Sequence, residues 1–244
     1  MLLDFIGGAV LIAVILIDLS TLIAALTGTQ RARYVVTAIA GLWVGAAIAV
    51  ASAGALATNY GSKVPLIGVL GFGPLVVFAG VALLSPTARS RMLAIPMPTL
   101  IGLNIARGLG VFFLLLAAAD RLGGPFPQFA GWGDIITSLD AILLVAMLAR
   151  GKATAGWIVA WNVFGALDLV VATTLALFSL NGTPFQLIHV GAGSDAILHL
   201  PWSLIPTVLV PVYLLTHGIM FGQLRQKVAV RDIGGDAAGM PSTA

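Results

Sequence analysis

The chain has 244 residues, of which 59% are hydrophobic and only 9% are charged, and its formal net charge is +3. Soluble domains carry about 25% charged residues, so this chain has too few charges to cover a surface that faces water. Cysteine is absent, which excludes disulfides, thiolate metal sites and cysteine nucleophiles. The basic residues lie in short pairs between apolar runs, a pattern typical of membrane orientation rather than of nucleic-acid binding.

Seven apolar stretches are long enough to cross the hydrocarbon core of a bilayer, which takes about 20 helical residues. The stretches are continuous rather than alternating, as in helices. The first is too long for the apolar region of a signal peptide, so we expect it to be retained. The predicted spans are about 2–26, 34–58, 65–85, 98–119, 131–149, 157–180 and 199–224. The sequence therefore predicts an all-α membrane protein, a seven-transmembrane-helix bundle over 1–224, with a disordered tail over 225–244.

The basic residues also predict the orientation of the bundle. Nine of them follow spans 1, 3, 5 and 7, whereas only Lys63 and Arg121 lie in the other loops. Short cytoplasmic loops carry an excess of lysine and arginine. We therefore predict that the N-terminus is outside, that the C-terminus is cytoplasmic, and that the protein resides in the inner cell membrane.

Several polar residues lie within the predicted spans, and Arg107 in the fourth is the most costly of them. An ionisable group at bilayer depth costs about 2.5–3.5 kcal/mol on insertion scales, so it usually faces the bundle and has a partner. We expect Arg107 to pair with Asp168 or Asp140. Two interpretations are open, a site for a solute, ion or proton and a charge pair that only fixes helix register. The predicted intramembrane polar site consists of Arg107, Asp140, Asp168, Asn104, Asn162, Asp18 and His217.

A second polar group is predicted at the outer face, where a ligand or metal site and ordinary solvated loops are both open interpretations. Its members are Asp134, His189, His199 and Arg121. His199 and His217 share one predicted helix and stand about 27 Å apart at 1.5 Å per residue, which argues against a bis-histidine haem. No metalloprotease, nucleophile-elbow or phosphate-loop motif is present in the sequence. We therefore predict neither a cofactor nor a catalytic residue.

The second predicted span carries small residues at every fourth position. Such a stripe lets another helix approach closely in a membrane. It fits internal packing, and it also fits a homo-oligomer face centred on Gly41 and Gly45. The stripe consists of Gly41, Gly45, Ala49, Ala53 and Ala57.

The second half of the chain resembles uncharacterised bacterial multi-pass membrane proteins. The likeness runs from Arg107 through Gly131-Trp132-Gly133-Asp134 to Asn162, Asp168, Pro206 and Pro211. It implies an integral membrane protein and brings no activity with it. The leading functional hypothesis is that the polar site binds or passes a small solute or ion. The alternatives are a non-catalytic accessory or assembly subunit of a membrane complex, and a membrane enzyme or haem protein. The expected partners are the lipid bilayer, the solute or ion, and a second copy of the chain.

Overall fold

The computed structural model describes residues 1–58 and 66–238, with side chains described to Gln226. Its regular elements are all helices within those ranges. Seven of the described helices are long and apolar enough to cross a membrane, and each overlaps one predicted span. They are Leu2–Leu26, Gln30–Ser52, Leu66–Leu84, Met97–Ala118, Phe126–Ala149, Ala155–Phe178 and Ile205–Gln226. The predicted all-α, seven-span architecture is confirmed.

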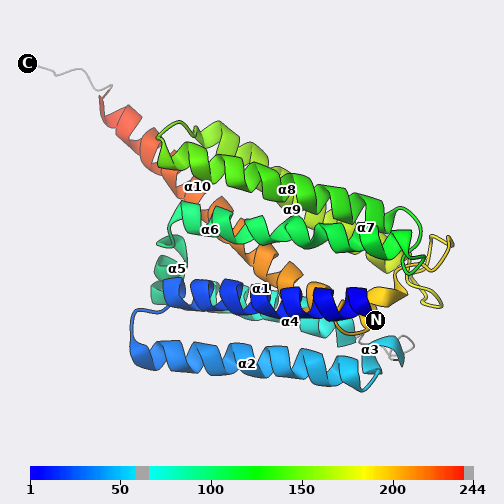
Figure 1. Ribbon diagram of the computed structural model, residues 1–244. Coiled ribbons are helices and arrows are strands. Elements are labelled where there is room, and N and C mark those ends of the chain that lie inside the picture. The colour runs from blue at the N-terminus through cyan, green and yellow to red at the C-terminus, as the bar shows by residue number, and fades with distance from the viewer. Residues whose placement is uncertain (59–65, 239–244) are drawn as a thin grey trace, which may run out of the picture.

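The spans form two groups with the last one running diagonally between them (Figure 1). One group contains α1 (Leu2–Leu26), α2 (Gln30–Ser52) and α4 (Leu66–Leu84). The other contains α6 (Met97–Leu103), α7 (Val111–Ala118), α8 (Phe126–Ala149) and α9 (Ala155–Phe178). The diagonal helix is α10 (Val210–Ala238), and the short helices are α3 (Ala55–Thr58), α5 (Pro86–Leu93) and η2 (Asp195–Leu198).

The two ends of the bundle differ in charge. One end, called here the Met1 end, holds the N-terminus, α3 and the connection between α9 and α10 (Figure 1). The opposite end, called here the basic end, holds α5 and the connections between α1 and α2 and between α8 and α9. The described basic residues at that end are Arg31, Arg33, Arg89, Arg91, Arg150, Lys152 and Arg225.

Three helices at the basic end begin at a hydroxyl residue that caps them. Thr29 accepts a hydrogen bond from the backbone N–H of Ala32, and Ser85 accepts one from that of Ala88, each at 3.2 Å. Thr154 caps α9 in the same way. A capping side chain replaces one of the backbone partners that the first turn of a helix lacks. These caps fix where α2, α5 and α9 start.

The two most buried spans, Met97–Ala118 and Ile205–Gln226, each contain a short segment that is not α-helical, and the two segments line one small cavity. The span 97–118 contains a 3₁₀ segment, η1 (Asn104–Gly110), and the last span begins with a π-helical segment, η3 (Ile205–Leu209). The hydroxyl of Ser138 donates to the carbonyl of Ile105 within η1, at 2.5 Å. Pro206 and Pro211 lack the N–H groups that an unbroken α-helix would use near η3. Such segments are often found at functional sites.

Glycines let α8 and η1 pack closely. A Cβ atom added to Gly110 would lie 2.8 Å from the carbonyl oxygen of Gly131, and one added to Gly131 would lie 2.7 Å from the Leu114 side chain. The space beside Gly110 and Gly131 cannot hold a side chain, so the contact between α8 and η1 requires glycine at both positions. Small residues at such a crossing allow two helix backbones to approach each other in a membrane.

The small-residue stripe of α2, by contrast, faces away from the bundle. Gly41, Gly45, Ala49 and Ala53 are all exposed. A Cβ atom added to Gly41 or Gly45 would meet nothing within 4 Å. Internal packing, the first interpretation of this stripe, is therefore wrong for these four residues.

Some predicted boundaries differ from those of the structure. The second span ends at Ser52 rather than near residue 58, because Ala53 and Gly54 turn the chain before α3. The predicted tail, 225–244, overlaps the last part of α10, and its disorder stays a prediction. Lys63, the loop around it and residues 239–244 lie outside the described residues.

Candidate functional site

Arg107 lies on η1 with its side chain 0% exposed, and its guanidinium group contacts three other spans. The Nε atom donates to Asp134 on α8 at 2.7 Å. The Nη2 atom pairs with Asp168 on α9. The Nη1 atom donates to the carbonyl oxygen of Gly165 at 2.9 Å and lies 3.3 Å from Nε2 of His217 on α10. One side chain therefore joins η1 to α8, α9 and α10.

The hydrogen bonds around His217 determine which ring nitrogen carries its proton. Arginine is a donor only, so Nε2 of His217 accepts from Arg107. Nδ1 must then carry the proton, and it donates to Oδ1 of Asn162 at 2.7 Å. The amide nitrogen of Asn162 donates in turn to the carbonyl of His217 at 3.3 Å. The imidazole is thus held as a neutral tautomer on an oriented Asn162.

The Arg107 cluster contains more acidic than basic groups. Its members are Arg107, Asp134, Asp168, Asn162 and His217. Asp134 and Asp168 both pair with Arg107, and their side chains are only 14% and 9% exposed. Elsewhere in the described chain the ion pairs are those of Asp4 with Arg121 and with the N-terminus. With both carboxylates ionised, the Arg107 cluster carries a net charge of −1. One added proton makes it neutral, which is the form that a hydrocarbon environment favours.

A cavity of about 20 Å³ lies beside this cluster, and η1 and η3 both line it. Its polar wall is formed by Arg107, Asp134 and Tyr213. One water needs roughly 10–15 Å³ of such space, so the cavity has room for about one. The hydroxyl of Tyr213 also donates to Asp18 on α1 at 3.0 Å, and Asp18 is 3% exposed. Tyr213 thereby links a third carboxylate to the cavity wall.

Two glycines make room for the cluster. A Cβ atom on Gly133 would overlap the carboxylate of Asp168. One on Gly165 would lie 2.7 Å from the His217 ring. The absence of a side chain at Gly133 is what lets Asp168 reach Arg107 across the α8–α9 contact.

The structure brings together most of the predicted intramembrane site. Arg107, Asp168, Asn162 and His217 form one network, and the predicted pairing of Arg107 with Asp168 is confirmed. Asp18 joins it only through Tyr213. Asn104 is one step removed. Its amide nitrogen donates to the carbonyl of Leu100 and the hydroxyl of Thr216, each at 3.0 Å, whereas its buried Oδ1 has no partner among the described residues.

Asp140 is not part of the site, and the alternative pairing of Arg107 with Asp140 is wrong. Asp140 is exposed on α8 and makes no ion pair within the described residues. It lies six residues past Asp134, which turns it about 240° around the helix. Asp134 occupies the position beside Arg107 that the sequence analysis predicts for Asp140.

Asp134 was predicted at the outer face because the span was expected to begin near residue 131. The helix begins at Phe126 instead. At 1.5 Å per residue Asp134 therefore lies about 12 Å from the helix start, rather than about 4–5 Å. The overlooked signals are Pro125 and Pro127, since proline favours the first turn of a helix.

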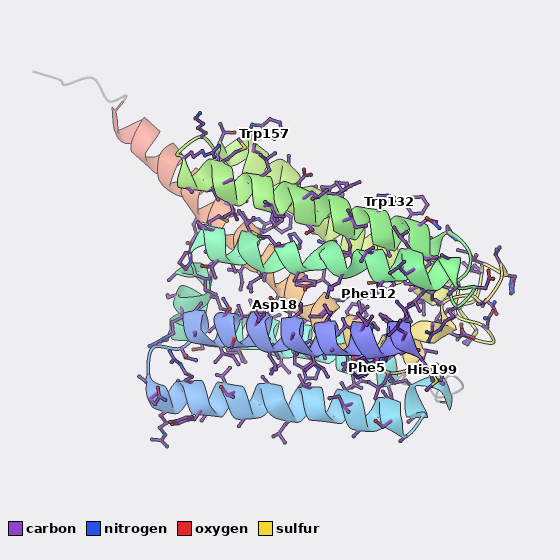
Figure 2. The ribbon with its side chains drawn as sticks, viewed as in Figure 1. Phe5, Asp18, Phe112, Trp132, Trp157 and His199 are labelled. Carbon is purple, nitrogen blue, oxygen red and sulfur yellow. The ribbon has the colours of Figure 1, made fainter. Side chains whose placement is uncertain are left out.

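The predicted outer-face cluster does not form a single site. Arg121 pairs with Asp4 at 2.6 Å, and Nε1 of Trp202 donates to the same carboxylate at 2.9 Å. His189 and His199 are exposed, and His199 lies at the Met1 end of the bundle (Figure 2). In the described ranges no group of three or more histidine, cysteine or acidic residues could hold a metal ion. The Asp4 contacts fix the start of α1 against the end of α7 and the segment before η3.

Residues 64–225 match a family model described as Domain of unknown function (DUF8737), and the chain belongs to that family. The match includes every member of the Arg107 cluster, whereas α1 and α2 precede it. Comparisons with curated proteins and with solved structures gave no match. The predicted resemblance to an uncharacterised family is confirmed.

We predict that Gly133→Ala lowers the stability of the purified protein, because the new methyl group displaces Asp168 from Arg107. Overpacking of this kind costs roughly 1–3 kcal/mol, measurable as a lower thermal midpoint in detergent. Gly102→Ala on α6 is the matched control, since a Cβ atom there meets nothing within 4 Å. Equal midpoints for Gly133→Ala and the wild type would show that Gly133 does not make room for Asp168.

Proposed function

We propose that the protein binds a proton at the Arg107 cluster and passes protons through the bundle. The observation that carries this proposal is the unequal charge of the cluster, two carboxylates on one buried guanidinium. A proton shared by Asp134 and Asp168 neutralises the site. A proton can then be gained or lost with only a small movement of side chains.

The size of the cavity supports a proton over a larger solute. A cavity of about 20 Å³ holds roughly one water. The guanidinium of Arg107 is engaged on every nitrogen by Asp134, Asp168, Gly165 and His217. Four of the five N–H donors of Arg107 are thus engaged by other spans, which together with the small cavity favours a proton over an organic solute.

The proposed route runs through groups that both donate and accept protons. A water in the cavity would connect Asp134 with the hydroxyl of Tyr213, and that hydroxyl already donates to Asp18. A hydroxyl can pass a proton on because it has one donor and two acceptor positions. Asp18 lies on α1 toward the basic end, since it is eight residues from Leu26. The route therefore joins the middle of the bundle to its basic half.

A second candidate function, an accessory or assembly subunit, is favoured by the outward face of α2. The stripe from Gly41 to Ala53 is exposed and offers a flat surface to another helix. Small residues in such a row are what lets membrane helices associate. We propose that this face pairs with a second copy of the chain, which is compatible with proton passage in each copy.

We further propose that the basic end is cytoplasmic and the Met1 end is outside, in the inner cell membrane. Seven described basic residues lie at the basic end, whereas Arg121 is at the Met1 end. This asymmetry follows the positive-inside rule for short loops.

We predict that Asp134→Asn and Asp168→Asn each abolish proton entry into liposomes that contain the purified protein. Each change removes the carboxylate that binds the proton but leaves a neutral cluster, so stability should stay within about 1 kcal/mol. Arg107→Gln strands two carboxylates and should cost roughly 3–5 kcal/mol. The readout is an internal pH dye under an imposed potassium diffusion potential.

Asp140→Asn is the matched control for that experiment, because Asp140 is an exposed carboxylate on the same helix. It should conduct protons like the wild type. Wild-type conduction in both cluster variants would refute the proton proposal and favour the accessory-subunit function.

For the orientation, we predict that a reporter fused after Arg231 is active in the cytoplasm. A reporter inserted in the loop 181–195 should be active only outside, because that loop lies at the Met1 end. The reverse result at either position would contradict the proposed orientation.

For the α2 face, we predict that Gly45→Cys gives an oxidative cross-link between two copies in native membranes. The chain has no cysteine of its own, so any cross-link reports the introduced residue. Leu143→Cys is the control, since Leu143 is 58% exposed but lies on α8, in the other group of helices. Equal cross-linking at both positions would mean random collision rather than a specific α2 interface.

A further inference from the structure

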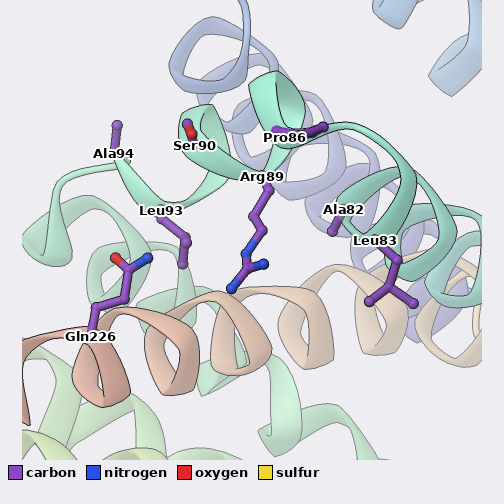
Figure 3. Close-up of a pocket in the computed structure, with 8 residues that line it drawn as sticks. All are labelled: Ala82, Leu83, Pro86, Arg89, Ser90, Leu93, Ala94 and Gln226. Atoms are coloured by element: carbon purple, nitrogen blue, oxygen red, sulfur yellow. The ribbon is translucent and has the colours of Figure 1, made fainter. Parts of the chain in front are cut away.

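A pocket of about 440 Å³ lies at the basic end, where α5 meets the end of α4 and the α10 helix (Figure 3). Its polar side chains are those of Arg89, Ser90 and Gln226. The Arg89 side chain extends from α5 toward α10, across the space between Leu83 and Gln226 (Figure 3). The remaining lining residues are small or apolar, namely Ala82, Leu83, Pro86, Leu93 and Ala94.

Arg89 brings an unbalanced positive charge to this pocket. It makes no ion pair with any carboxylate in the part of the chain that the structure describes, where the ion pairs are those of Asp4, Asp134 and Asp168. The described loops of the basic end contain no acidic residue. Among the side chains that the structure describes, none neutralises this guanidinium, so we expect it to bind an anion from outside the chain.

The lining of the pocket changes from apolar at Leu83 to basic at Arg89, six residues further along the chain. Leu83 lines the pocket and Leu84 lies next to it in the chain, and these two leucines at the end of α4 are 82% and 87% exposed. Leucines that exposed at the end of a membrane span face lipid chains, whereas Arg89 follows on the helix just beyond the span. A phospholipid has the same order of groups, an apolar chain and then a phosphate. Basic pockets between spans are known to bind anionic head groups.

We propose that this pocket binds the phosphate of an anionic phospholipid, with the acyl chains along Leu83 and Leu84. The guanidinium of Arg89 would pair with the phosphate oxygens, and the Ser90 hydroxyl and the Gln226 amide would donate to them. Arginine suits this role because its planar fork matches two phosphate oxygens at once. The proposal is independent of proton passage.

The joint that forms the pocket is well fixed. The amide of Gln223 on α10 donates to the carbonyl oxygen of Leu93, the last residue of α5, at 3.1 Å and to that of Ile95, two residues later, at 2.7 Å. Gln223 is 8% exposed. These bonds hold α5 against α10 and so fix the two helices that form the pocket.

Arg91 provides a matched control, because it lies on the same helix but points elsewhere. A Cβ atom on Gly28 would overlap the Arg91 guanidinium. Arg91 therefore packs against the connection between α1 and α2 and not into the pocket. The two arginines have equal charge, so a difference between them reports the pocket.

The test is native mass spectrometry of the purified protein with phosphatidylglycerol, with phosphatidylcholine and with inorganic phosphate. We expect the wild type to retain phosphatidylglycerol preferentially and Arg89→Gln to bind it about fivefold more weakly. Arg91→Gln should bind like the wild type. Ala82→Trp keeps every charge but fills the pocket, and it should also weaken binding.

Four outcomes would overturn the proposal. The first three are equal binding of the two phospholipids, unchanged phosphatidylglycerol binding in Ala82→Trp, and equal losses in Arg89→Gln and Arg91→Gln. Displacement of bound phosphatidylglycerol by inorganic phosphate at equal concentration would assign the pocket to free phosphate, and would overturn it as a lipid site. Because Arg89 is exposed, its loss leaves the helical content unchanged, which circular dichroism checks.

Discussion

The pairing of Arg107 inside the bundle is the constraint on which the other features of the structure depend. A guanidinium group in hydrocarbon needs a partner for each of its nitrogens, and here α8, α9 and α10 supply them. These partners fix the depth and the rotation of three spans around η1. The glycines at 133 and 165 follow from this requirement, since a larger residue at either position would enter the space of Asp168 or His217.

The irregular helical segments also belong to this constraint. The 3₁₀ segment η1 and the π segment η3 line the same small cavity. The hydroxyl of Ser138 donates to the carbonyl of Ile105 in η1, and Arg107 of η1 donates to the carbonyl of Gly165 on α9. In a membrane, free backbone groups are tolerated only where protein or water satisfies them. The irregular backbone of η1 lies in the core of the bundle, where the Ser138 side chain supplies one such bond.

The sequence predicted what depends on composition and missed what depends on rotation about a helix. Apolar runs of span length define all seven helices, and the cost of a buried charge identifies Arg107 and Asp168. The prediction that Asp134 lies at the outer face depends on where α8 begins, because a start five residues too late places Asp134 close to the helix end. The direction of the α2 stripe was not readable either, since small residues look the same whether they face protein or lipid. The contact of Asn162 with His217 joins residues 55 apart in the chain, which no local pattern encodes.

The presence of two carboxylates beside Arg107 distinguishes a proton-binding site from a charge pair that only holds helices together. One aspartate would neutralise Arg107, and a neutral pair is all that fixing helix register requires. The chain places two there and holds both with little exposure, so the folded cluster carries an extra negative charge unless it takes up a proton. His217 cannot supply the missing charge, because its Nε2 accepts from Arg107 and its Nδ1 proton is committed to Asn162. A charge imbalance of one, enclosed with space for one water and linked through Tyr213 to Asp18, fits the binding of a proton better than it fits a purely structural pair.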